Sequence, residues 1–234
     1  MPRLIAAFLR HGDYKQLPGV PSALQAFGLT DTGQKQALQG ALEIHSYCQQ
    51  QSLHIHHVID SSTLLRAWQT ASIIKTRLKE DTSQVLSIES HDDLCERSVG
   101  SMANLNTVQI ETILHDDPRF ETPPPNWKSD SHYCLPFQGA ESLLNAGSRV
   151  AKHIHKNLSR IKPQITRDTL KIFVGHGASF RHAAHHLGLL EFAQIAQLSM
   201  FHARPVFLEF QDDLSYKHIN GEWKIRAKEE TSMD

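Results

Sequence analysis

Two short motifs each place a histidine directly after an apolar run. Arg10-His11-Gly12 follows the run 4–9, and Gly175-His176-Gly177 follows the run 170–174. In open α/β sheets, chemistry gathers at the carboxyl ends of the strands, so we expect the two histidines to share one pocket. The arginine beside His11 is permanently charged, and its planar guanidinium matches phosphate oxygens. The two motifs therefore predict a phosphate site.

Phosphate chemistry gives these residues distinct roles. A neutral imidazole can attack phosphorus and form a phosphohistidine, which divides one slow displacement into two faster ones. We expect His11 to be this nucleophile, with its tautomer fixed by a hydrogen bond from the other ring nitrogen to a nearby carbonyl. Positive charge around the equatorial oxygens stabilises phosphoryl transfer. Arg10 and a protonated His176 would supply part of that charge.

Three further segments complete a pattern along the chain. They are Ser61-Ser62-Thr63-Leu64-Leu65-Arg66-Ala67-Trp68-Gln69-Thr70-Ala71, Leu94-Cys95-Glu96-Arg97 followed by Gly100, and Gly139-Ala140-Glu141-Ser142. With the two histidine motifs, and in the same order, they resemble the histidine phosphatase superfamily in its phosphoglycerate-mutase-like branch, over about the whole chain. The resemblance implies that Arg66 is the second phosphate-binding arginine, that Glu96 is the acid and that His176 is the second catalytic histidine.

A proton donor for the leaving alkoxide has to lie outside the cationic ring. Burial there can hold the proton of Glu96 near neutral pH, and Glu96 would return as general base for the water that hydrolyses the phosphohistidine. Ser62 or the amides after Gly177 would add donors to the phosphate, since helix amino termini favour anions.

Some of these residues also have simpler interpretations. Glu96 belongs to an acidic stretch that a solvated face would equally explain, together with Glu89, Asp92 and Asp93. Glu141 and Ser142 are expected to cap a helix start rather than to catalyse. Ser179 and Arg181 lie close enough to His176 in sequence to reach a substrate, or else form a solvated first turn.

The chain departs from the family pattern after Gly12. The segment 13–18 leaves the family's substrate loop unmatched, and the Arg and Pro that follow Arg-His-Gly in the acid-phosphatase branch are missing, so the smaller branch fits better. We expect a phosphatase acting on a small phosphate ester or a phosphoprotein. A phosphoglycerate-type mutase and a phosphoprotein-binding module that lost turnover remain alternatives, and the oligomeric state is not predicted.

The 16 histidines raise the question of a metal. His54, His56 and His57 form one group, and His182, His185 and His186 form another, but neither comes with the cysteine or carboxylate pattern of a familiar zinc site. The arginines and His176 would already supply the charge that a metal brings. We therefore expect no metal and no cofactor.

Composition limits the classes of partner. The 234 residues are 40% hydrophobic and 21% charged, which is enough for one globular domain. The chain has 24 Lys and Arg and 25 Asp and Glu, so its formal net charge is close to zero. We therefore expect no general electrostatic attraction to nucleic acid or to an anionic membrane. Three cysteines without Cys-x-x-Cys spacing favour reduced thiols in the cytoplasm. The opening apolar run is too short for a signal peptide or a membrane span.

The hydrophobic pattern predicts an α/β fold. Nearly continuous apolar runs predict strands at 4–9, 58–60, 84–89, 170–174 and 205–210, and amphipathic stretches between them predict helices. This alternation favours a three-layer sandwich, a mostly parallel sheet with helices on both faces. Asn220-Gly221 between 216–219 and 222–225 predicts a hairpin that forms a small antiparallel edge.

One insertion interrupts the predicted single domain 1–234. Residues 118–138 contain Pro123-Pro124-Pro125, which denies them regular structure, yet they carry the aromatic anchors Phe120, Trp127, Tyr133 and Phe137. Long irregular loops in compact domains are often lids over a site. A surface insertion held down by its aromatic residues is the equal alternative.

Overall fold

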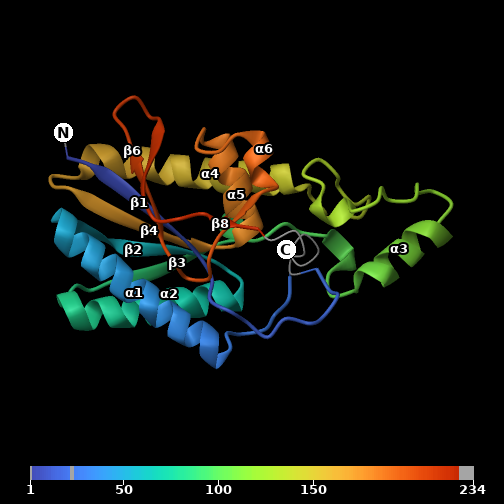
Figure 1. The fold of residues 1–234 in the computed structure, drawn as a ribbon, viewed down its shortest axis with the longest axis horizontal. Coiled ribbons are helices and arrows are strands. Elements are labelled where there is room, and N and C mark those ends of the chain that lie inside the picture. The colour runs from blue at the N-terminus through green and yellow to red at the C-terminus, as the bar shows by residue number, and fades with distance from the viewer. Residues whose placement is uncertain (1, 22–23, 227–234) are drawn as a thin grey trace.

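A twisted central sheet organises the molecule, shown in Figure 1 for the computed structural model, which describes residues 2–21 and 24–226. Its strands are β1 (Leu4–Arg10), β2 (His54–Ser62), β3 (Ser87–His91), β4 (Thr169–Gly175), β6 (Val206–Phe210) and β7 (Tyr216–Asn220). They lie in the order β3-β2-β4-β1-β6-β7, in which the first four are parallel while β6 is antiparallel to β1 and β7 to β6. A separate small sheet pairs β5 (Leu198–Ser199) with β8 (Lys224–Ile225).

Helices cover both faces of the large sheet (Figure 1). The helices are α1 (Asp31–Gln51), α2 (Leu65–Thr82), α3 (Thr107–Asp116), α4 (Leu143–Ile161), α5 (Gly177–His186) and α6 (Phe192–Ile195). Short 3-10 helices are η1 (Asp92–Leu94), η2 (Gly100–Met102), η3 (Trp127–Ser129) and η4 (Lys162–Gln164). In Figure 1, α1 and α2 lie below the sheet, and α4 and α5 lie above it.

β1 shows why two helical layers are needed. Successive side chains of a strand point to opposite faces, and every residue from Leu4 to Leu9 is fully buried. Ile5, Ala7 and Leu9 pack in one core with α1 and α2, whereas Leu4, Ala6 and Phe8 pack in a second core with α4 and α5. The continuous apolar run is therefore the signature of a strand covered on both sides, and the predicted three-layer α/β fold is confirmed.

The helix starts follow their capping residues. Thr30 caps α1 by accepting from the amide of Gly33, and Ser142 caps α4 by accepting from the amide of Asn145 across 3.1 Å. The predicted capping role of Ser142 is thus confirmed. Glu141 beside it forms an ion pair with Arg149.

The predicted hairpin around Asn220-Gly221 is wrong. β7 pairs with β6 through the turn at 211–215, and β8 pairs with β5 instead of β7. Gly221 has a positive φ of 83°, but a Cβ placed there would lie 2.3 Å from the carbonyl oxygen of Pro205. This glycine lets the chain pass close to the start of β6 rather than reverse. The antiparallel edge exists, but β6 and β7 form it.

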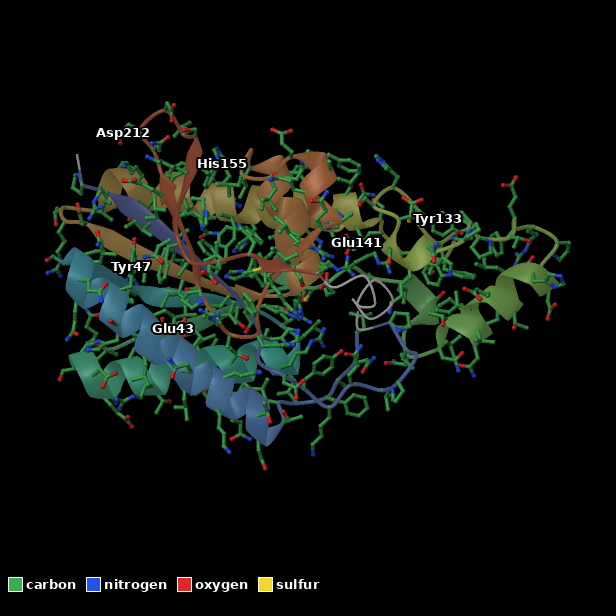
Figure 2. The ribbon with its side chains drawn as sticks, viewed as in Figure 1. Glu43, Tyr47, Tyr133, Glu141, His155 and Asp212 are labelled. Carbon is green, nitrogen blue, oxygen red and sulfur yellow. The ribbon has the colours of Figure 1, made fainter. Side chains whose placement is uncertain are left out.

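The insertion is larger than predicted and has its own small core. Val99, Ile110, Leu114, Trp127 and Leu135 form this cluster, so η2 and the unpredicted helix α3 belong to the same excursion. It extends to one side of the sheet in Figure 1, and Figure 2 labels Tyr133 within it and Glu141 where the chain rejoins the main body. Its aromatic residues act as the anchors that the sequence indicated.

Within residues 2–21 and 24–226, none of the helices combines the length and the apolar character that crossing a bilayer requires.

Candidate active site

The two histidine motifs meet because their strands are neighbours. β1 and β4 are parallel, with Arg10 opposite Gly175, so His11 and His176 leave the sheet side by side at its carboxyl edge. The amide of His11 donates to the carbonyl oxygen of Gly175 across 2.9 Å. The ring centroids of the two histidines are 5.1 Å apart. The structure brings them together as predicted.

The tautomer of His11 is fixed from both sides. Its Nδ1 lies 2.7 Å from the carbonyl oxygen of Gly12, which can only accept, so Nδ1 carries the proton. Its Nε2 lies 3.3 Å from Nε of Arg66, which can only donate, so Nε2 presents its lone pair. Burial and then the charges of Arg66, His176 and Arg10 lower the pKa of His11 well below its usual value. His11 is therefore a neutral imidazole with a basic Nε2.

Arg66 lies in the first turn of α2 and is fully buried. Its Nη1 donates to the carbonyl oxygen of Gln25 across 3.0 Å, and the guanidinium carbon lies 4.6 Å from the ring centre of Tyr14. Burial lowers the pKa of Arg66, while attraction to Tyr14 and Glu96 opposes this shift. An arginine remains charged at neutral pH despite such a shift, so the site contains a fixed, oriented cation.

Arg10 ends β1, and Gly177 makes room for its side chain. Nη1 of Arg10 donates to the carbonyl oxygen of Met200 across 3.3 Å. A Cβ at position 177 would lie 3.2 Å from Cδ and 3.3 Å from Nε of Arg10. The glycine therefore lets the backbone after His176 approach the guanidinium.

His176 is fully buried and bonded to Ser62. Its Nε2 lies 2.9 Å from Oγ of Ser62, while its Nδ1 is covered and makes no hydrogen bond to any residue that the structure describes. Burial and then repulsion from Arg66, Arg10 and Arg149 lower the pKa of His176 well below its usual value. Contrary to the expectation from the sequence, burial and then the three nearby arginines oppose protonation of His176 in the unliganded protein.

Ser62 contacts His176, and its expected contact with phosphate stays a prediction. Its hydroxyl also lies 3.2 Å from Sγ of Cys95 and accepts from the amide of Leu64. These contacts tie the end of β2 to the segment that carries Glu96. Ser62 thus acts on the phosphate site through His176.

Glu96 caps helix α5. Its Oε1 accepts from the amide of Ser179 across 2.9 Å, its Oε2 accepts from the amide of Ala178 across 3.2 Å, and the amide of Arg97 donates to Oε1. The amides after Gly177, expected to bind phosphate, therefore bind this carboxylate. The helix amino terminus favours an anion, as predicted, but the anion is Glu96.

Three further residues lie at the site to which the sequence analysis assigned no role. The hydroxyl of Thr70 accepts from the amide of Gly12 across 3.0 Å, and Nδ1 of His202 lies 2.9 Å from the carbonyl oxygen of His11. Thr70 is one helical turn beyond Arg66, so the helical spacing could have indicated it. Tyr14 lies in the unmatched loop and His202 three residues before the strand predicted at 205–210, where residue type alone indicated nothing.

The two polar residues after His176 have structural partners. The amide of Ser179 is bound to Glu96, and its hydroxyl lies 3.4 Å from the carbonyl oxygen of His176. Nη1 of Arg181 donates to the carbonyl oxygen of Leu198 across 2.7 Å. Both are buried, so neither forms a solvated first turn.

Known structures share this fold. A mycobacterial glucosyl-3-phosphoglycerate phosphatase superposes with a TM-score of 0.65 at 20% identity, covering 96% of this chain and 98% of that one. A phosphoglycerate mutase from Bacillus anthracis superposes with a TM-score of 0.68 at 15% identity, covering 94% of this chain and 93% of that one. A search of curated proteins gave no significant match.

The family assignment comes from the sequence itself. The family model described as "Histidine phosphatase superfamily (branch 1)" matches residues 7–219. This span includes both histidine motifs, Arg66 and Glu96. The chain belongs to the histidine phosphatase superfamily, branch 1.

Proposed function

We propose that this protein is a metal-independent phosphatase that hydrolyses phosphate monoesters through a phosphohistidine at His11. The observation that carries the proposal is the pair of contacts on the His11 ring, with Nδ1 at the carbonyl oxygen of Gly12 and Nε2 at the guanidinium of Arg66. They orient a neutral nitrogen nucleophile beside a fixed cation. A nucleophile oriented in this way is what phosphohistidine chemistry requires.

In the first step, Nε2 of His11 attacks phosphorus and the ester P–O bond breaks. Arg10 and Arg66 neutralise the equatorial oxygens, and the buried Nδ1 of His176 is available to a phosphate oxygen when Ser62 donates to Nε2. Glu96 gives its proton to the departing alkoxide, which leaves as the alcohol. We propose that Glu96 carries this proton in the complex with the substrate.

In the second step, the carboxylate of Glu96 removes a proton from water. The water oxygen attacks phosphorus, the P–N bond breaks, and phosphate leaves with His11 again neutral. The developing negative charge falls on the same oxygens in both steps, so one set of cations serves both.

The substrate is proposed only by class, as a small phosphate ester or a phosphoprotein. A solved structure of the same fold is a phosphatase of glucosyl-3-phosphoglycerate, and another is a phosphoglycerate mutase. The loop after Gly12 and the insertion, which depart from the family pattern, lie where such specificity would arise. Sugar phosphates and phosphoglycerates are accordingly the first compounds to test.

The test is a screen of phosphate esters and phosphopeptides in which released phosphate is measured, with His11→Ala as the control. We expect release by the native protein, rapid labelling of the native protein by a radioactive substrate, and neither in His11→Ala. A folded His11→Ala protein with native turnover would overturn the mechanism. Interconversion of phosphoglycerates without net release would instead identify a mutase, and tight binding without labelling would identify a binding module.

A further inference from the structure

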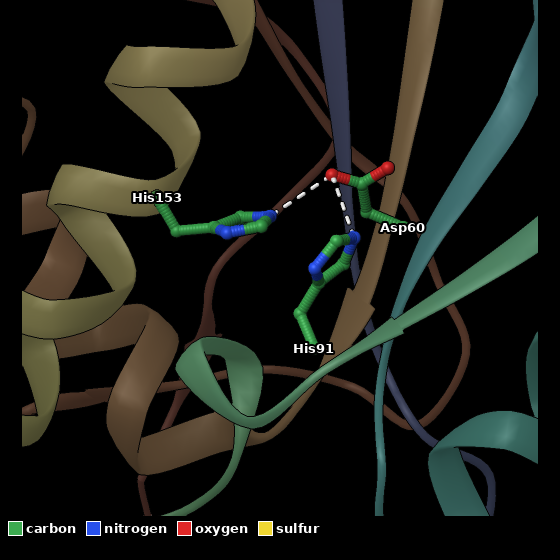
Figure 3. A group of neighbouring side chains, drawn as sticks. All are labelled: Asp60, His91 and His153. Atoms are coloured by element: carbon green, nitrogen blue, oxygen red, sulfur yellow. Dashed lines mark hydrogen bonds and ion pairs between the residues drawn. The ribbon is translucent and has the colours of Figure 1, made fainter.

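A second cluster of reactive side chains lies beside the sheet and takes no part in the proposed reaction. Asp60 is on β2, His91 is the last residue of β3, and His153 is on α4, so three separate elements deliver them to one place (Figure 3). We propose that these three residues bind a divalent transition-metal ion, with zinc as the best fit. The sequence did not indicate this group, because its members are far apart along the chain.

The geometry of the three donors suits one ion. Oδ2 of Asp60 lies 2.9 Å from Nε2 of His153 and 3.8 Å from Nε2 of His91. One ligand atom from each residue lies within 4.8 Å of the other two. Tetrahedral zinc with bonds of about 2.0–2.1 Å separates its ligand atoms by about 3.3 Å. The distances from Oδ2 of Asp60 to the two imidazole nitrogens, 2.9 Å and 3.8 Å, lie on either side of that value, so small side-chain rotations would complete the site.

An orphaned nitrogen is an independent sign of a ligand. Nε2 of His91 is covered by the protein and makes no hydrogen bond to the described residues, although Oδ2 of Asp60 and Oε2 of Glu89 each lie 3.8 Å away. A buried polar atom without a partner is costly and calls for an explanation such as an ion. An ion between His91, Asp60 and His153 would satisfy it.

The neighbours of the cluster orient its ligands. Lys171 donates to Oδ1 of Asp60 across 2.5 Å and to the carbonyl oxygen of Val58 across 2.8 Å, which leaves Oδ2 toward the imidazoles (Figure 3). Nδ1 of His153 lies 3.6 Å from Oδ2 of Asp93. A carboxylate behind a ligating histidine is the usual outer-shell partner at zinc sites, where it fixes the ring.

The local charge also favours a dication. Oε2 of Glu89 lies 3.8 Å from Nε2 of His91, so Asp60, Glu89 and Asp93 bring three carboxylates against the one ammonium of Lys171. Hard ions such as magnesium prefer oxygen ligands, whereas imidazoles suit zinc and its neighbours in the first transition row. Two imidazoles and one carboxylate with a fourth position for water or Glu89 therefore suit a first-row transition ion such as zinc better than magnesium or calcium.

Such an ion would tie β2, β3 and α4 together. His91 is followed directly by η1, and the chain then reaches Glu96 after Cys95. The ion would hold the start of the segment that carries the proposed acid. Its expected effect is on stability, since an ion that binds only the folded chain raises the unfolding midpoint.

The experiment titrates the full chain, freed of metal by a chelator, with Zn²⁺ and with Co²⁺. We expect one equivalent to bind, a visible Co²⁺ absorption typical of nitrogen and oxygen ligands, and a higher unfolding temperature with Zn²⁺. His91→Ala and His153→Ala should each weaken binding by at least about tenfold, and Asp93→Asn by about tenfold. His91 lies at a strand end, so its variant tests the site even if His153→Ala fails to fold.

Two controls distinguish this site from other histidines. His57→Ala removes an exposed histidine of a separate pair, and His11→Ala removes one from the phosphate site. Both should retain the equivalent of bound metal and the shift in unfolding temperature. The proposal is overturned if the native protein binds no equivalent, if His91→Ala retains full affinity, or if His11→Ala alone abolishes binding. These measurements do not include phosphatase activity. A protein that binds no metal would therefore refute the metal site without bearing on the proposed reaction.

Discussion

Nε of Arg66 lies 3.3 Å from Nε2 of His11, so the only side of the ring that can attack phosphorus faces a permanent donor. A guanidinium cannot accept a hydrogen bond, and the carbonyl oxygen of Gly12 at Nδ1 cannot donate one. Both neighbours demand the same tautomer. The resting ring is thus prepared for nucleophilic attack without a separate base.

Replacing Arg66 should therefore affect both charge and orientation. We expect Arg66→Ala to lower kcat/KM about a hundredfold or more, as for loss of one preorganised donor to a developing anion. Arg66→Lys should recover little of this, because an ammonium does not reproduce the planar fork. Steady-state kinetics on the best ester from the screen measure the effect.

Arg77→Ala on the same helix is the matched control, since Arg77 pairs with Glu80 and Asp81 near the surface. It should leave kcat/KM unchanged. A loss of only twofold in Arg66→Ala would remove Arg66 from the phosphate site.

A methyl group at position 177 tests the placement of Arg10. Gly177→Ala puts a Cβ 3.2 Å from Cδ of Arg10, so the guanidinium must shift. The shift needed is a few tenths of an ångström, and displacements of about an ångström can cost up to a hundredfold in rate, so we expect kcat/KM to fall by a few-fold, up to about tenfold, and inhibition by vanadate to weaken in parallel. Unchanged vanadate affinity in a folded variant would show that Arg10 does not need this position.

The parts of the site that follow from strand ends were predictable from the sequence. Apolar runs covered on both faces identify buried parallel strands, and the chain positions of His11 and His176 then place them at one edge. The carbonyl contact that fixes His11 also followed from what an imidazole nucleophile needs. Local patterns sufficed because the sheet determines these positions.

Contacts between distant loops were not predictable in the same way. Glu96 meets the amides of Ala178 and Ser179 only because the chain after η1 packs against the start of α5, and no local pattern encodes that meeting. The protonation state of His176 was not predictable because its pKa depends on complete burial and then on Arg66, Arg10 and Arg149, which the fold brings together. The prediction of a hairpin at Asn220-Gly221 was wrong because it used a local sequence signal alone. In the fold, Gly221 packs against the backbone of Pro205 instead of reversing the chain.

Buried neutral histidines should make stability depend on pH. Burial, opposed in part by the hydrogen bond to the carbonyl of Ala178, lowers the pKa of His182 to about 4. Between about pH 6.5 and pH 4 the unfolded chain binds a proton at this residue and the folded chain does not, so stability falls as pH falls. His11 and His176 contribute in the same direction. Denaturant unfolding at a series of pH values measures this slope.

His182→Gln isolates one of these contributions. At pH 7 the variant should be less stable than the native protein, because it disturbs the contacts of His182 with Ala178 and Ser131. The native protein loses stability as the pH falls because its unfolded state alone binds a proton at His182, and the variant lacks this group. The difference in stability should therefore shrink by up to about 1.4 kcal/mol for each pH unit below 6.5. His218→Gln, at an exposed histidine, should leave the slope unchanged. A deficit that is constant with pH would mean that His182 titrates alike in both states.

Chelation separates the reaction from the proposed metal cluster. The arginines supply the positive charge in the proposed reaction, so exhaustive treatment with a chelator should leave kcat unchanged at a temperature where the protein stays folded. The unfolding temperature should fall on the same treatment and recover with Zn²⁺. Activity that disappears with the chelator and returns with zinc or magnesium would refute the metal-independent mechanism.

Glu96 can be tested as an acid because a proton donor matters most when the leaving alkoxide is basic. We expect Glu96→Gln to damage hydrolysis of alkyl phosphates by about a hundredfold and hydrolysis of aryl phosphates far less, whereas Arg10→Ala should damage both. The glutamine retains an acceptor oxygen for the amides of α5, so its fold should remain native. Kinetics on a matched pair of alkyl and aryl esters provide the comparison.

The pH profile distinguishes an acid from a structural cap. If Glu96 donates the proton, the alkyl ester rate of the native protein should decline at alkaline pH, where Glu96 is ionised, and Glu96→Gln should lose that decline. A variant that had only lost the cap of α5 would be less stable but slowed alike on both esters, with its pH profile unchanged. That outcome would move the search for the acid to Asp92, Asp93 or Glu141. Of these, Glu141 is already paired with Arg149, and Asp92 accepts from Thr63, so Asp93 would be the first to replace.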